Sequence, residues 1–146
     1  YLVGACATPK IIEEAGPAET DGTIFNIEGP IDRAAEDADF SLYVAAAEEY
    51  GDGFDPVGAG TVTFRSFMNL WSVLVELDDV TPQAIGDALG ARTDEPSFMG
   101  HPYTCDQRQL SGLPSMCSPQ QILARIEDGE LVQLGDWIDV GAVPGA

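Results

Sequence analysis

The chain has 146 residues, the size of one domain, and its apolar content of 45% suffices for a buried core. Its 25 acidic residues outnumber its 6 basic residues and give a formal net charge of −19. This balance excludes nucleic acid and anionic membrane surfaces as partners, because both require patches of Lys and Arg. The acidic residues are scattered along the chain, which is typical of a solvated, highly soluble surface.

The first elements form a strand, a helix and a second strand. Tyr1–Ala5 is short and apolar, as expected for a buried strand. Thr8 followed by Pro9 predicts a helix start, and Gly16 predicts its end. Thr23–Ile27 is the second apolar strand. Since a helix connects them, we expect the two strands to be parallel, with a right-handed crossover.

An amphipathic helix is predicted over Ala38–Tyr50, capped by Asp37 and stopped by Gly51. Its expected buried stripe consists of Phe40, Val44, Ala47 and Tyr50. The Gly-rich segment 51–60 that follows contains no phosphate-binding pattern, so we expect a plain loop there.

The most apolar helix is predicted over Thr61–Leu77. Its polar residues Arg65, Asn69, Ser72 and Glu76 are spaced four, three and four, and therefore form one narrow stripe. Apolar side chains cover the rest of the helical wheel. We therefore expect a sheet or other helices to cover this helix on nearly all sides.

The remaining elements are shorter. Thr81 and Pro82 repeat the cap-then-Pro signal and start a helix that ends near Gly90, and Phe98–Thr104 is expected to be extended. Asp128–Gly129 lies between two apolar runs, which predicts a β-hairpin of strands over 121–126 and 130–134. The segment from Ser118 also fits a helical capping box, but the alternation of apolar residues up to the turn favours the strand. Residues 140–146 are expected to be a loose tail.

Three cysteines are present. Cys105 and Cys117 flank a segment rich in Gly, Pro and Ser, which in a secreted chain is typical of a disulfide that closes a surface loop. Two free thiols in a cytosolic chain are the alternative. The spacing fits no CxxC zinc pair and His101 is the sole histidine, so no metal site and no cofactor are predicted.

No hydrolase motif appears, and no catalytic residues are assigned. Cys6 follows the first predicted strand and precedes a helix start, the position where open α/β sheets bind ligands. Three interpretations stay open for Cys6: a buried apolar residue, a cleft-lining residue, or a reactive thiol of a cysteine-dependent enzyme.

The order of these elements resembles the second lobe of type I periplasmic substrate-binding proteins, in the branched-chain amino-acid group of ABC importers. The resemblance covers essentially the whole chain. It is carried by YLVGACATPKIIEEAG, DGTIFNIEGP, the Thr63–Phe64 pair, TPQAIGDAL, and the cysteine-containing tail FMGHPYTCDQRQLSGLPSMCSPQQILARIEDGELVQL. It implies an α/β, Rossmann-like three-layer lobe with a parallel sheet and a C-terminal β-hairpin, forming one domain over 1–146.

The resemblance also implies a function without catalysis. We expect a solute-binding protein that closes two lobes on a small solute, with ligand contacts from Ala5, Cys6, Ala7, Thr8 and Phe64. In amino-acid-binding members the resemblance implies a carboxylate near Cys6, and none is present here. A ligand-sensing module of the same fold is the alternative.

Partners and location follow from the same resemblance. The chain begins at Tyr1 without Met or a signal peptide, so we expect a protein processed or cut from a longer chain. An amino-terminal lobe, an ABC permease and a lipid anchor before the chain are implied. The implied location is extracytoplasmic, in the periplasm or at the cell surface.

Overall fold

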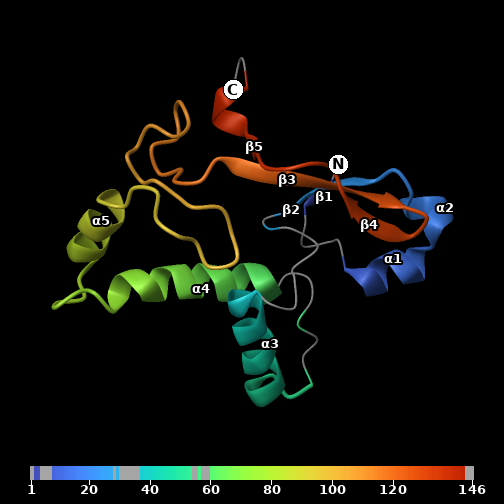
Figure 1. The fold of residues 1–146 in the computed structure, drawn as a ribbon, viewed down its shortest axis with the longest axis horizontal. Coiled ribbons are helices and arrows are strands. Elements are labelled where there is room, and N and C mark those ends of the chain that lie inside the picture. The colour runs from blue at the N-terminus through green and yellow to red at the C-terminus, as the bar shows by residue number, and fades with distance from the viewer. Residues whose placement is uncertain are drawn as a thin grey trace. The chain divides into compact units, whose positions relative to one another are not determined.

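A computed structural model describes residues 2–3, 8–27, 29, 37–53, 56 and 60–143. The chain divides into two compact units, and Figure 1 shows their elements in chain order. The first unit comprises Tyr1–Phe64 and Gln121–Trp137, and the second comprises Arg65–Gln120 and Ile138–Ala146. The prediction of one domain over the whole chain stays a prediction.

The first unit contains a mixed β-sheet. Its strands are β1 (Leu2–Val3), β2 (Ile24–Ile27), β3 (Gln120–Glu127) and β4 (Glu130–Gln133), in the order β1-β2-β3-β4. The pair β1–β2 is parallel, which confirms the predicted strand–helix–strand unit. The pairs β2–β3 and β3–β4 are antiparallel, and the second of these is the predicted hairpin around Asp128. The sheet is therefore mixed, because the hairpin joins the parallel pair in the opposite direction.

Helices α1 (Pro9–Ala15) and α2 (Pro17–Thr20) connect β1 to β2. The first begins as predicted, since Thr8 caps it and Pro9 occupies its first turn. Gly16 ends α1 with φ of 81°, a conformation that favours glycine. Pro17 then starts a further helical turn that the sequence pattern did not predict.

Alternation along β2 and β3 builds the core of the first unit. Each of these strands directs every second side chain to the face that α1 covers. The residues buried on this face are Ile12 of α1 with Phe25, Ile27, Ile122, Ala124 and Ile126 of the sheet, and Leu131 and Trp137 pack against them. Burying an aliphatic side chain of this size contributes about 1.5–3 kcal/mol, so burial on this face stabilises the unit.

Helix α3 (Ala38–Tyr50) begins at the predicted cap, since the Asp37 carboxylate accepts hydrogen bonds from the Asp39 and Phe40 N–H groups. The predicted buried stripe of this helix is wrong at its C-terminal end. Tyr43 is the buried residue, at 3% exposure, whereas Tyr50 is 83% exposed in the last turn. The Tyr43 ring packs against Phe40 and Phe64, and this aromatic contact decides which side of the helix is covered.

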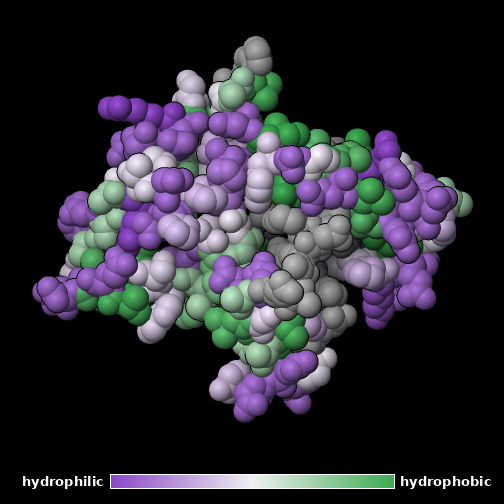
Figure 2. All heavy atoms as spheres, in the orientation of Figure 1, coloured by the Kyte–Doolittle hydropathy of each residue, from purple (hydrophilic) through white to green (hydrophobic). Residues whose placement is uncertain are grey.

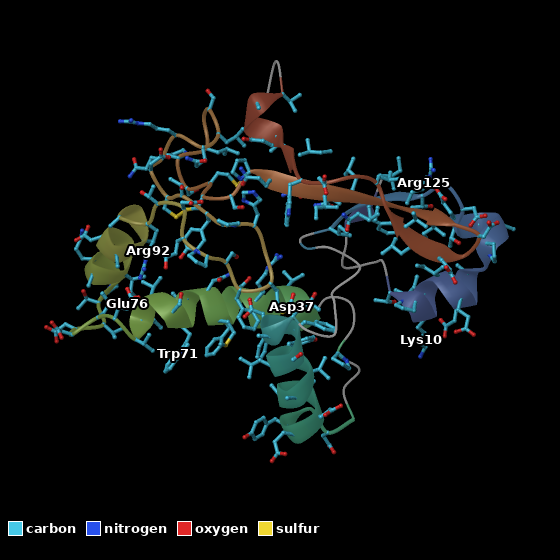
Figure 3. The ribbon with its side chains drawn as sticks, viewed as in Figure 1. Lys10, Asp37, Trp71, Glu76, Arg92 and Arg125 are labelled. Atoms are coloured by element: carbon cyan, nitrogen blue, oxygen red, sulfur yellow. A yellow bond between two sulfur atoms is a disulfide. The ribbon has the colours of Figure 1, made fainter. Side chains whose placement is uncertain are left out.

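Helix α4 (Gly60–Leu74) ends three residues before the predicted boundary, because Glu76 and Leu77 donate to carbonyls three residues back. The prediction that other elements cover this helix on nearly all sides is wrong for the described residues. Val73 is fully buried, but exposed fractions of 41–59% are found for Phe67, Leu70, Trp71 and Val75. Figure 3 shows Trp71 projecting outward from α4, and Figure 2 shows apolar side chains over this region.

One polar residue of α4, Asn69, helps to explain this difference, because its side chain bonds to other residues of the second unit, whereas Ser72 of the predicted polar stripe is exposed. The Asn69 side chain donates to Ser97 Oγ at 3.1 Å and accepts from the Phe98 N–H at 2.7 Å. Glu76, two residues past the helix, forms an ion pair with Arg92. Only the side of a helix that contacts neighbouring segments is covered, and in α4 the hydrogen bonds of Asn69 lie on that side.

The rest of the second unit consists of short elements. Helix α5 (Pro82–Gly90) starts at its predicted Thr81 cap, and β5 (Ile138–Asp139) precedes a 3-10 turn over Val140–Ala142. The turn occupies the first residues of the predicted loose tail. Phe98–Thr104 is not extended throughout: a turn begins the segment, and a single β-bridge pairs Tyr103 with Glu95.

Candidate functional site

Of the predicted solute-binding loop Ala5–Thr8, the structure describes Thr8 alone. Ala5, Cys6 and Ala7 lie outside the described residues, and their predicted ligand contacts stay predictions. The Thr8 hydroxyl accepts a hydrogen bond from the Ile11 N–H at 3.3 Å and thereby caps α1. This bond occupies one acceptor position of Thr8, and the hydroxyl hydrogen stays available to a ligand.

Phe64, the other predicted ligand contact, lies in the second turn of α4 and is partly buried. Its ring centroid is 5.1 Å from that of Tyr43, with the two ring planes tilted by 52°. A pair at this distance is a favourable aromatic contact between α3 and the start of α4. The ring therefore has a packing role in the first unit, and its contact with a solute stays a prediction.

An amide pair on the sheet was not predicted. Asn26 of β2 donates from Nδ2 to Oε1 of Gln121 on β3 at 3.0 Å. Asn26 Oδ1 is buried, and the described part of the chain offers it no hydrogen-bond partner. The available signal in the sequence was a single amide side chain within the apolar strand TIFNI, where a buried polar group requires a partner.

The disulfide between Cys105 and Cys117 is present, and it joins two residues twelve positions apart. The Thr104 N–H donates to the Cys117 carbonyl at 3.0 Å, and the Cys105 N–H donates to the Arg92 carbonyl at 3.0 Å. The bond therefore holds both ends of the loop 106–116 next to the residue that carries the main ion pairs of this unit.

Arg92, just past α5, pairs with Glu76 just past α4 and with Glu95 on its own segment. Its guanidinium pairs with Glu76 and, at 3.2 Å, with Glu95, and Figure 3 shows the Arg92 and Glu76 side chains pointing toward each other. The hydrogen bond to Glu76 raises the pKa of Arg92, and the attraction of both carboxylates adds to this effect against the opposing effect of burial. Because its charge is matched within the unit, Arg92 is a structural residue and not a site for an anion.

Tyr103 lies beside this cluster and is 9% exposed. Burial raises the pKa of its phenol, while the charge of Arg92 lowers it and the two glutamates raise it. The Tyr103 hydroxyl has no hydrogen-bond partner among the described residues. The phenol is therefore held in its neutral form well into the alkaline range.

Two features are absent from the described ranges: a metal-binding cluster and a membrane-spanning helix. The His, Cys, Asp and Glu side chains of these ranges form no group of three or more that could hold a metal ion. Among their helices none has both the length and the apolar character needed to cross a membrane.

Comparisons with known proteins give one likeness of fold. No family model matches the sequence, and no curated protein matches it. Among solved structures, the crystal structure of a leucine-binding protein, LivK, from Thermotoga maritima is similar with a TM-score of 0.62 over 97% of this chain. The sequence identity is 13%, and the match spans 37% of the LivK chain.

This likeness shows the fold alone, a mixed helix and strand arrangement that matches one part of the leucine-binding protein. The predicted fold class is therefore confirmed. At such low identity the residues of a site do not transfer between the two proteins, and function requires its own argument.

Proposed function

We propose that this chain is the second lobe of an extracytoplasmic solute-binding component of an ABC importer, of the branched-chain amino-acid type. In this proposal a second lobe, outside the 146 residues, closes with it on a small solute, and a membrane permease receives that solute. No catalytic step is involved. The observation that carries the proposal is the likeness to the leucine-binding protein over 97% of the chain.

The geometry of the first unit supports a ligand role. Its strands β1 and β2 are parallel, so their carboxyl ends lie at the same edge of the sheet. In α/β sheets ligands bind beyond the carboxyl ends of the strands, where backbone N–H groups are available. The predicted residues Ala5 to Thr8 follow β1 at this end, so the proposal retains them as candidates.

The disulfide supports the proposed extracytoplasmic location. Stable disulfides form in oxidising environments such as the periplasm or the cell surface and are rare in the cytosol. The Cys105–Cys117 bond therefore favours an extracytoplasmic location over a cytosolic one. A lipid anchor belongs to the proposal through the resemblance alone.

The exposed side of α4 supports a longer protein. Phe67 and Trp71 on consecutive turns of α4, and Val75 just past its end, are each at least half exposed. Monomeric proteins rarely leave such a contiguous apolar surface uncovered. Additional chain packed on this side of α4 would remove it from water.

Intact mass of the protein isolated from its source tests the two-lobed architecture. We expect a mass well above the 15.5 kDa of this chain, since the leucine-binding protein is longer than the matched part. A mature protein of 15.5 kDa would contradict the proposal of a second lobe.

A thermal-shift screen of the longer protein tests the function. Branched-chain amino acids, other neutral amino acids and small amides form the panel, and a solute that binds the folded state should raise Tm in a concentration-dependent way. The 146-residue chain alone is expected to bind the same solute weakly, because half of the contacts are absent. Submicromolar binding by the 146-residue chain in calorimetry would refute the two-lobed clamp.

A further inference from the structure

Four apolar side chains form an exposed row along α4 and its end, called here the α4 row: Phe67, Leu70, Trp71 and Val75. The Val75 N–H donates to the Trp71 carbonyl at 3.1 Å, so the helical spacing continues to Val75. The row lies opposite Val73, which is fully buried, and Figure 3 shows Trp71 pointing away from the helix. Its length of about 12 Å suits contact with one further helix or strand.

An acidic pair, Asp78 and Asp79, follows the α4 row in the chain. Both side chains are exposed, and neither is bonded to another described residue. Arg92, the cation paired nearest to this end, is already matched by two glutamates. Figure 2 shows hydrophobic side chains over α4 and hydrophilic ones at the loop between α4 and α5. The row therefore has an apolar body and a negative end that the described residues leave unmatched.

Charge separates the candidate occupants of the α4 row. A second copy of the chain would bring another net charge of −19 against the first, and an anionic membrane surface would be repelled in the same way. A segment that carries apolar residues together with Lys or Arg is attracted, because its cations complement the aspartates. A cation can also contact the face of the exposed Trp71 ring. The complementary occupant is therefore cationic and amphipathic.

The length of the similar solved structure indicates where such a segment lies. The chain matches 37% of the leucine-binding protein, so a protein of that fold has much additional chain. A segment within the same protein is present at a high effective concentration and needs only modest contacts to stay bound. An origin in the same protein is therefore favoured over a separate partner.

We propose that the α4 row, with Asp78 and Asp79, is the docking site for a cationic amphipathic segment of the same protein outside the 146 residues. The inference rests on the proposed function, which places this chain in a longer protein, and adds the chemistry of the segment that contacts α4. Apolar side chains of the segment cover Phe67 and Trp71, and its Lys or Arg side chains pair with the two aspartates.

Two synthetic helical peptides test this chemistry on the 146-residue chain. Both carry Leu at the spacing i, i+3, i+4 and i+7, and the polar positions hold Lys in one peptide and Glu in the other. We expect the Lys peptide to shift the Trp71 fluorescence to shorter wavelength with saturation, and added salt to weaken its binding. The Glu peptide should leave the emission unchanged. Equal shifts with both peptides would overturn the cationic class, and no shift with either would overturn the docking site.

Two variants connect the fluorescence signal to the α4 row. Trp71→Gln should remove the shift, because the remaining tryptophan belongs to the first unit. Phe67→Gln keeps the Trp71 signal and should weaken binding of the Lys peptide by about tenfold, the change expected when an aromatic anchor is lost. A shift that persists in Trp71→Gln, or unchanged affinity in Phe67→Gln, would refute the assignment.

A charge variant and its matched control test the acidic end. Asp78→Asn combined with Asp79→Asn should weaken the Lys peptide by about fivefold, the change expected from two exposed charge pairs. Glu48→Gln combined with Glu49→Gln removes the same charge from exposed positions of α3 and should leave the affinity unchanged. An equal loss in both double variants would show attraction by net charge alone and refute the role of the aspartates.

Acrylamide quenching of Trp71 in the longer protein separates this inference from the proposed function. The Trp71 contribution is the difference between parent and Trp71→Gln, and we expect its quenching constant to be several-fold lower than in the 146-residue chain. If a solute raises Tm while Trp71 stays accessible, the docking site is wrong and solute binding stands. If Trp71 is protected and no solute raises Tm, the transport role fails while the docking site stands. Protection that appears only with dimer formation in sedimentation would assign the row to a second copy and overturn the proposal.

Discussion

The first unit buries six residues in one cluster between α1 and its sheet, whereas the second contains a disulfide and an ion-pair cluster, and its buried apolar residues are Val73, Met99, Tyr103 and Cys105. In the first, alternation along β2 and β3 supplies a continuous apolar face. In the second, few residues are buried, and Arg92, Asn69 and the Cys105–Cys117 bond join segments that the chain leaves apart. Covalent and polar links thus substitute for apolar burial where a small unit has little core.

The largest effect is expected in the sheet core. Ile122 is 1% exposed and faces Ile27 across β2–β3. Ile122→Ala should lower the free energy of unfolding by about 2–5 kcal/mol, because it removes buried methyl groups and leaves a cavity. Urea unfolding followed by circular dichroism measures the change. Val132→Ala on β4 is the control at 38% exposure, and an equal loss in both variants would show that the core is not where the structure places it.

Removal of the disulfide should have the next largest effect. The variant with Ser at both Cys105 and Cys117 should lose about 3 kcal/mol under oxidising conditions, because the loop is no longer closed in the unfolded chain. Thermal unfolding with and without reductant measures this difference. The parent protein should fall to the stability of the variant once reduced. Equal Tm values for oxidised parent and variant would contradict a stabilising bond.

A smaller, pH-dependent effect is expected from Tyr103. Burial raises the pKa of its phenol in the folded state, so the folded protein keeps this proton at a pH where the unfolded chain releases it. Stability from this group is complete below pH ~10 and falls as the pH rises through the raised pKa. The slope of unfolding free energy against pH above 10 should be shallower in Tyr103→Phe. A slope in Tyr103→Phe equal to that of the parent would contradict this prediction.

The smallest effect is expected on the exposed side of α4. Trp71→Gln should change the stability of the 146-residue chain by no more than about 0.5 kcal/mol, since Trp71 is 50% exposed. Val73→Ala, on the buried side of the same helix, should cost about 2 kcal/mol. Chemical denaturation measures both. A larger loss of stability in Trp71→Gln than in Val73→Ala would show that the side of α4 with Trp71 is the buried one.

Local signals determined much of the fold. The caps at Thr8, Asp37 and Thr81 each begin a helix, and Asp128 and Gly129 both have the positive φ that the predicted hairpin turn requires. The parallel pairing of β1 and β2 followed from the helix between them. These features depend on residues close together in the chain, and propensity and chain geometry act there without help from distant segments.

Only the tertiary structure decided which sides the elements present. Asn69 of α4 bonds to Phe98 and Glu76, just past this helix, pairs with Arg92, and these partners lie 29 and 16 residues away, where no pattern within the helix encodes them. The pairing of Asn26 with Gln121 joins residues 95 positions apart. Periodicity identifies an apolar or polar side, but the partner of that side depends on contacts between distant segments, and these form only when the whole unit folds.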